Sequence, residues 1–261
     1  MRRIIKDTIL ELWRGNVSYI IVIIMFFGLL LSVSATYSIK DAGWFQEIKE
    51  INIKKIGYLQ GLLYFSFLWK GIILSILGSF AFSKYVYSDK LSFLFLSVDK
   101  KRFLISRLIG FILLLSLFFI FWNIILSFFA FPLKILSYIE VFIFSTIGDF
   151  LIFLFLFIPL FFGLYLSPVS TSFLTIILLS IGEVHIFLTP LFDIRLTDNI
   201  RKILSFFPDV IGLVMFFPEK YFSVPYGTLN IMPNFITLII YVSECLIFFL
   251  LFILQVKRLE L

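Results

Sequence analysis

Residues 108–130 read LIGFILLLSLFFIFWNIILSFFA, and this stretch decides what kind of fold the chain has. It carries no charged residue and lies between Arg107 and Lys134. About 20 consecutive apolar residues cross a bilayer as a helix. The stretch therefore predicts a membrane-spanning helix.

The composition of the whole chain agrees with that interpretation. Of 261 residues, 61% are hydrophobic, 20% are aromatic and only 15% are charged, and there are 37 Phe. The mean hydropathy is +1.11. A soluble domain is about half apolar and about a quarter charged, and one core of this size could not bury so much Phe, Leu and Ile. The composition excludes a soluble globular domain.

The long gaps between charged residues predict an all-α membrane protein with six transmembrane helices in a single domain, residues 1–261. The six spans are expected at residues 18–37, 58–83, 108–130, 141–166, 169–189 and 234–255. The fourth and fifth spans are separated only by Leu166-Ser167-Pro168-Val169. Because together they are too long for one span, we expect a helical hairpin turned by Pro168.

The distribution of Lys and Arg outside the spans predicts the orientation. With a cytoplasmic N-terminus, the inner segments hold 12 Lys/Arg and 5 Asp/Glu, whereas the outer segments hold 9 and 8. Both termini are therefore expected in the cytoplasm, in a multi-pass protein of the cell membrane. The basic groups then lie where anionic lipid or a cytoplasmic partner would meet them, and nucleic acid is not expected as a partner.

Residues 1–16 predict an amphipathic helix on the inner membrane surface. At 100° per residue, one face is apolar and the other is charged. The apolar face holds Ile5, Thr8, Ile9, Leu12 and Trp13, and the charged face holds Arg3, Lys6, Asp7, Glu11 and Arg14. The alternative is an incidental basic flank that only orients the first span.

The loop at residues 84–107 is the longest cytoplasmic segment predicted, and it contains apolar residues that no span explains. Asp89 can cap a short helix there. The apolar residues are Leu91, Phe93, Leu94, Phe95 and Leu96, and the basic cluster Lys100, Lys101 and Arg102 follows them. An exposed apolar patch of this kind marks a contact with a protein or a membrane.

In this layout the chain resembles the ABC-2 type permease family, the membrane subunits of ATP-driven exporters. The family has six spans, an amphipathic connecting helix before the first span, and a coupling helix between spans two and three. Val98 stands where the family commonly has Pro, and Ser106-Arg107 stands where it commonly has Gly-Lys. The segment at residues 190–233 is similar to the family's extracellular region before the last span.

The resemblance implies that a separate cytoplasmic ABC ATPase subunit contacts residues 91–96 and the connecting helix. The chain contains no Gly-x-x-x-x-Gly-Lys-Ser/Thr phosphate-binding loop, so we expect no ATPase activity and no catalytic residue in it. Six spans are half of the usual complement for such a transporter. The resemblance therefore also implies a second permease copy or a paralogue, as a homodimer or a heterodimer.

Four ionisable residues lie inside the predicted spans, where such groups are costly and commonly functional. They are Lys70, Asp149, Glu183 and Glu244. The expected depths bring Lys70 and Glu244 within reach of each other, whereas Asp149 and Glu183 lie shallower. The latter two could share a proton, line an outer vestibule or bind a cationic substrate. The alternative is that all four make interhelical contacts that stabilise the bundle.

Neither a metal nor a cofactor is expected. His185 is the only His, and it is two residues from Glu183, so the two side chains point to different faces of a helix. Two other functions stay open: a secondary transporter or channel that uses the intramembrane carboxylates, and an accessory or immunity protein. A Phe-rich interior would suit a hydrophobic substrate such as a lipid, a peptide or a drug.

Overall fold

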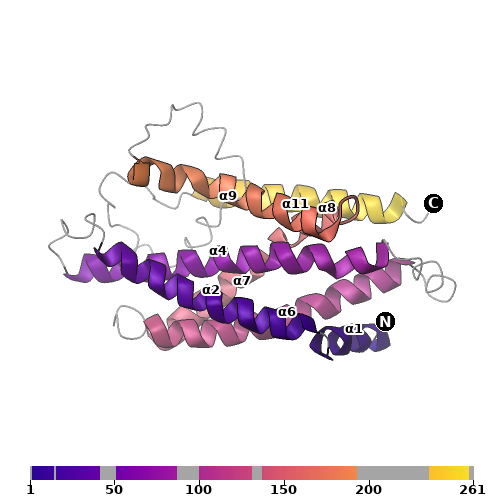
Figure 1. Cartoon of the computed structure of the whole chain (residues 1–261), viewed down its shortest axis with the longest axis horizontal. Helices are drawn as coiled ribbons and strands as arrows, with labels where there is room; N and C mark the ends of the chain where they lie inside the picture. Colours follow the sequence, from indigo (N-terminus) through magenta and orange to yellow (C-terminus); the bar gives the residue numbers. More distant parts are fainter. Residues whose placement is uncertain are drawn as a thin grey trace.

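The computed structural model describes residues 2–14, 16–41, 51–86, 100–130, 137–192 and 235–258. Within these ranges the chain is helical and contains no strand. The helices are α1 (Arg2–Arg14), α2 (Asn16–Asp41), α4 (Ile51–Val86), α6 (Lys100–Ala130), α7 (Tyr138–Phe155), α8 (Phe157–Phe162), α9 (Pro168–Phe192) and α11 (Phe235–Arg258). They form an elongated bundle (Figure 1).

Four described segments are long and apolar enough to cross a membrane. They are Gly61–Phe80 of α4, Arg102–Ala130 of α6, Tyr138–Phe162 of α7 and α8, and Leu238–Gln255 of α11. Shorter apolar stretches, Ile21–Ser34 and Pro168–Ile181, lie within α2 and α9. These segments confirm the prediction of an all-helical fold and indicate insertion into a membrane.

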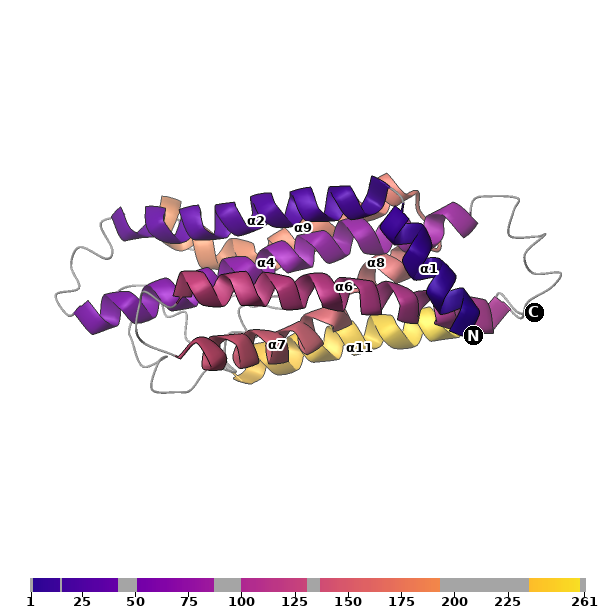
Figure 2. The same ribbon diagram turned by 90° about the horizontal axis from the view of Figure 1, so that it is seen from below.

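The long helices run along the bundle in alternating directions (Figures 1 and 2). One end of the bundle holds α1, the last turn of α4, the first turn of α6, the hairpin between α8 and α9, and the last turn of α11. The described helix ends that border the predicted inner segments therefore lie at one end of the bundle. The N-terminal and C-terminal helices also reach this end, as expected if both termini lie on the same side of a membrane.

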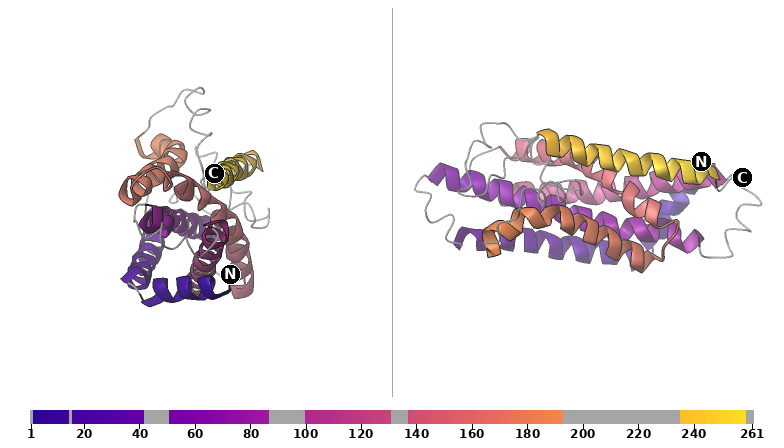
Figure 3. Two further views of the ribbon diagram at one scale, coloured as in Figure 1. Left: turned by 90° about the vertical axis from the view of Figure 1, so that its right-hand side faces the viewer. Right: turned by 90° about the horizontal axis from the view of Figure 1, so that it is seen from above.

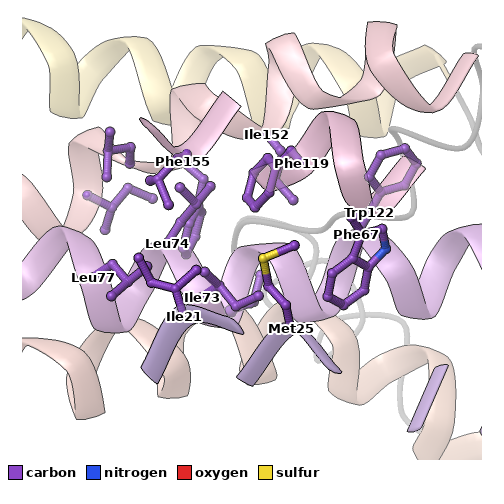
Figure 4. Packing of buried hydrophobic residues seen from close by; sticks show 14 of the residues in the cluster. Ile21, Met25, Phe67, Ile73, Leu74, Leu77, Phe119, Trp122, Ile152 and Phe155 are labelled. Atoms are coloured by element: carbon purple, nitrogen blue, oxygen red, sulfur yellow. The ribbon is translucent and has the colours of Figure 1, made fainter. Parts of the chain in front are cut away.

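Helix α4 is the centre of the bundle, because it contacts α2, α6, α7, α8 and α9. Its apolar segment is 67% buried, whereas that of α11, which packs on α7 and α8, is only 17% buried. Figure 4 shows side chains of α2, α4, α6 and α7 interlocking around α4, among them Met25, Leu74, Trp122 and Ile152. Since lipid is as apolar as these side chains, close packing and polar contacts rather than water exclusion hold such helices together.

Two predicted segments have different bounds in the structure. Both ends of the expected loop at residues 84–107 are helical, because α4 continues to Val86 and α6 begins at Lys100. The fourth apolar segment runs over Tyr138–Phe162, where a span was expected at residues 141–166, but it is divided into two helices, since α7 ends at Phe155 and α8 begins at Phe157. Pro159 explains the break: it has no N–H to donate to the preceding turn. Its ring packs against Gly78 of α4, where an added Cβ would lie 2.9 Å from Pro159 Cγ.

The hairpin between α8 and α9 confirms a turn at this position, but Pro168 does not form it. Pro168 is the first residue of α9, a position where a missing N–H costs nothing. The hydroxyl of Ser167 accepts a hydrogen bond from the backbone N–H of Ser170 at 3.3 Å. The turn is therefore made by residues 163–167, and α9 begins directly after it.

Candidate functional site

Lys70, Asn123, Thr146 and Asp149 form a polar network between α4, α6 and α7, which we call the Lys70 network. Lys70 Nζ donates to Asp149 Oδ1 at 2.5 Å and to Asn123 Oδ1 at 2.7 Å. Asn123 Nδ2 donates to Asp149 Oδ2 at 2.7 Å and to Thr146 Oγ1 at 3.3 Å. The hydrogen bonds form a closed triangle of Lys, Asn and Asp that joins three helices.

The network lies in the interior of the bundle. The exposed fraction is 0% for Lys70, 0% for Asn123 and 5% for Asp149. An isolated charge at such a position is costly, and buried charges occur where they are paired and hydrogen-bonded. The pairing of Lys70 with Asp149 therefore makes both charges tolerable among apolar helices.

Aromatic rings complete the surroundings of the ammonium group. Lys70 Nζ lies 5.4 Å from the ring centroid of Phe67 and 5.3 Å from that of Phe119, within cation–π range. The ring of Phe67, labelled in Figure 4, lies over Gly148, and a Cβ at that position would overlap it. Gly148 therefore lets α7 approach α4 closely enough for the adjacent Asp149 to reach Lys70.

The depths of Lys70 and Glu244 made a pair between them geometrically possible, but Lys70 has other partners. Lys70 is bound to Asp149 and Asn123, and Glu244 lies half-buried on α11, which packs on α7 and α8. The prediction compared only the depths of the two residues. Depth does not specify which helix faces a side chain points toward, and α4 is surrounded by several helices.

The prediction that intramembrane charges make interhelical contacts holds for Lys70 and Asp149. Both oxygens of Asp149 accept hydrogen bonds within the network, and its side chain is nearly inaccessible. This arrangement does not place Asp149 on an open vestibule. Glu183 belongs to α9, and its side chain lies outside the described part of the structure.

Asn123 and Thr146 are functional candidates that the sequence reasoning missed. That reasoning followed only ionisable residues. Asn123 is nevertheless the only amide side chain in the stretch at residues 108–130, where a buried amide needs polar partners. Thr146 lies three residues before Asp149 on α7, so both can face the same neighbouring helix.

A second predicted site concerns the end of the bundle where α1 lies. A helix over residues 1–16 was predicted, and α1 confirms it. Its apolar face packs on α6 and α2: Thr8 is 3% exposed, and Ile5 and Ile9 are half-buried. Leu12 and Trp13 belong to α1, but their side chains lie outside the described part.

Gly110 of α6 makes the contact with α1 close. A Cβ at this position would lie 3.1 Å from both the Ile5 carbonyl oxygen and Thr8 Cβ. The predicted apolar face of α1 therefore meets a neighbouring helix, and its orientation is set by that packing. The prediction placed this face against the membrane surface and did not include its packing on α6.

The predicted coupling residues fall partly outside the described structure. Leu91, Phe93, Leu94, Phe95 and Leu96 lie outside it. Lys100, Lys101 and Arg102 form the first turn of α6 rather than part of a loop, and Arg102 is exposed there.

Taken together, the structure contains a closed polar network in the bundle interior and a docked amphipathic helix at one end. The network joins α4, α6 and α7 by hydrogen bonds, and α1 packs on α6 and α2. No family model, curated protein or solved structure matches this chain.

Proposed function

We propose that this chain is the membrane subunit of an ATP-driven exporter of the ABC-2 type, and that a separate cytoplasmic subunit hydrolyses ATP. The observation that carries the proposal is the packing of α1 on α6 at Gly110. Helix α6 begins at Lys100, directly after the predicted coupling residues 91–96. The packing thus supports a mechanism in which a cytoplasmic partner at this end of the bundle moves α6 by contacting α1 and residues 91–96.

The Lys70 network supports a path for that movement into the membrane. Gly110 and Asn123 lie on the same helix, about 20 Å apart at 1.5 Å per residue. Asn123 holds Lys70 of α4 and Asp149 of α7. A displacement of the first turns of α6 would therefore carry α4 and α7 with it.

The proposal includes six spans, with both termini in the cytoplasm and the protein in the cell membrane. Helices α2 and α9 have 26 and 25 residues, which exceeds the length of about 20 that a span needs. The basic residues of α1 and of the first turn of α6 lie at the same end of the bundle. Two such subunits, identical or related, would assemble with two ATPase subunits.

The test is purification of the tagged full chain from native membranes, followed by an ATPase assay. We expect a copurifying subunit with a Gly-x-x-x-x-Gly-Lys-Ser/Thr loop, and loss of ATPase activity when the Lys of that loop is replaced by Ala. Leu94→Asp and Gly110→Leu should lower the amount of bound ATPase or its stimulation. Leu113→Phe, on an exposed position of α6, is the control for a larger side chain. Hydrolysis of ATP by the chain alone would refute the proposal.

A second candidate is a secondary transporter that relays protons or ions through Lys70 and Asp149. The observation that favours it is a pair of opposite charges in the bundle interior. It predicts transport driven by an ion gradient in proteoliposomes that lack any ATPase. We favour the first function because Asn123 is hydrogen-bonded to both Lys70 and Asp149. A network in which all three residues are bonded to one another is suited to joining helices.

A further inference from the structure

The exposed face of α1 is a charged surface that does not pack against the described part of the bundle. Arg3, Lys6 and Asp7 are exposed on it. The side chains of Arg3 and Asp7 are 93% and 66% exposed, and they lie 4.0 Å apart. A pair this exposed contributes little to stability, so Arg3 stays available to another anion.

The position of α1 indicates what surrounds this face. In the end-on view α1 lies along the outer edge of the bundle, and in Figure 2 it crosses the ends of the long helices obliquely (Figures 2 and 3). Its inner face is covered by α6 and α2. Its outer face therefore points away from the bundle, toward the surroundings of the protein at this end.

The neighbouring helix indicates that these surroundings are the surface of the membrane. Directly after α1, α2 exposes Tyr19, and then the apolar side chains Val22, Ile23, Phe26 and Phe27 along the same helix. Exposed Tyr165 lies in the hairpin between α8 and α9, at the same end of the bundle. Tyrosines are enriched where hydrocarbon meets headgroups, so α1, which lies beyond Tyr19, is at headgroup level.

We propose that the outer face of α1 binds the headgroups of anionic phospholipids through Arg3 and Lys6. An amphipathic helix ordinarily holds to a membrane by burying its apolar face among acyl chains. In α1 that face packs on α6, so the attraction to lipid is mainly electrostatic. The site continues the apolar surface of α2, which favours a lipid over a protein as its occupant. It does not depend on the proposed coupling to an ATPase.

The experiment measures lipid binding to the purified full chain by native mass spectrometry, with phosphatidylglycerol and phosphatidylcholine as probes. Each basic residue near an anionic surface is expected to favour the anionic lipid by about fivefold at low salt. The wild-type chain should therefore prefer phosphatidylglycerol. Arg3→Gln/Lys6→Gln should lower this preference several-fold, and raising the salt concentration should lower it in the wild type.

Two further variants make the result decisive. Asp7→Asn removes the carboxylate next to Arg3 and should increase the preference for phosphatidylglycerol, which a poorly folded variant would not do. Lys54→Gln/Lys55→Gln, in the first turns of α4 at the opposite end of the bundle, should change it little.

An unchanged preference in Arg3→Gln/Lys6→Gln, or an equal loss in the Lys54/Lys55 control, would overturn the assignment. If Arg3→Gln/Lys6→Gln keeps the preference but no longer copurifies an ATPase, the face is a protein-docking surface and the lipid site is wrong. If no ATPase copurifies with any form while the lipid preference follows Arg3 and Lys6, the lipid site stands and the proposed function fails.

Discussion

Replacing Lys70 by Met would leave the carboxylate of Asp149 without its ion-pair partner in the bundle interior. Asp149 would keep one hydrogen bond, from Asn123 Nδ2. Removal of one partner of a buried ion pair costs about 3–5 kcal/mol, because the other charge stays uncompensated. We expect Lys70→Met and Asp149→Leu each to lower the free energy of unfolding by about this amount.

The double variant Lys70→Met/Asp149→Leu removes both charges and should recover most of the lost stability, because a buried ion pair replaced by apolar residues is often neutral in stability. The coupling energy of this double-mutant cycle then distinguishes two kinds of contact. Ordinary interhelical hydrogen bonds in membranes average about 0.6 kcal/mol and reach about 1.7 kcal/mol. A coupling above about 2 kcal/mol would identify Lys70–Asp149 as an interdependent ion pair.

The assay is reversible unfolding of the purified chain in mixed micelles, followed by circular dichroism as the fraction of denaturing detergent rises. The control cycle combines Lys70→Met with Tyr241→Phe on α11, whose hydroxyl donates to the carbonyl of Leu151 at 3.4 Å. Tyr241 is not part of the Lys70 network, so this cycle should be additive. Additive losses for Lys70 and Asp149 themselves would refute the network as described.

Three other experiments test the packing. Gly148→Ala, which favours an isolated helix by about 1 kcal/mol, should instead lower stability because of the overlap with the Phe67 ring; a rise in stability would contradict the packing. Gly110→Leu should detach α1 from α6 and make Thr8→Cys react with a water-soluble maleimide, whereas Thr8→Cys alone should react slowly because Thr8 is 3% exposed. Ser79→Cys/Ser172→Cys should form a disulfide between α4 and α9 on oxidation, since the two hydroxyls are hydrogen-bonded; failure to crosslink would place these helices farther apart.

The sequence predicted the helices well because charge distribution alone locates apolar spans. Residues 18–37, 58–83 and 234–255 lie almost wholly within α2, α4 and α11. The break at Leu156 was not predicted, although Pro159 was its visible signal. An apolar run of this length indicates a helix, and only the local rule for Pro would have divided it.

The sequence predicted which residues are unusual better than it predicted their partners. Lys70 and Asp149 were identified because a charge stands out in an apolar span. Their pairing depends on which faces of α4 and α7 meet, and that is set by details such as the missing side chain of Gly148. Depth along a helix does not contain this information. Asn123 was overlooked because it is polar but uncharged, and only charged residues were followed within the spans.

The Lys70 network also has a bearing on how the chain enters the membrane during synthesis. Lys70 precedes Asn123 by 53 residues and Asp149 by 79 residues. Because synthesis proceeds from the N-terminus, α4 and its Lys70 are made and must enter the membrane before Asn123 or Asp149 has been synthesised. A central Lys opposes insertion by about 2.5–3.5 kcal/mol, whereas each Leu, Ile, Phe or Val favours it by about 0.3–0.6 kcal/mol. The apolar residues of α4 can offset that cost, and α6, which arrives next, supplies the first amide that Lys70 can bind.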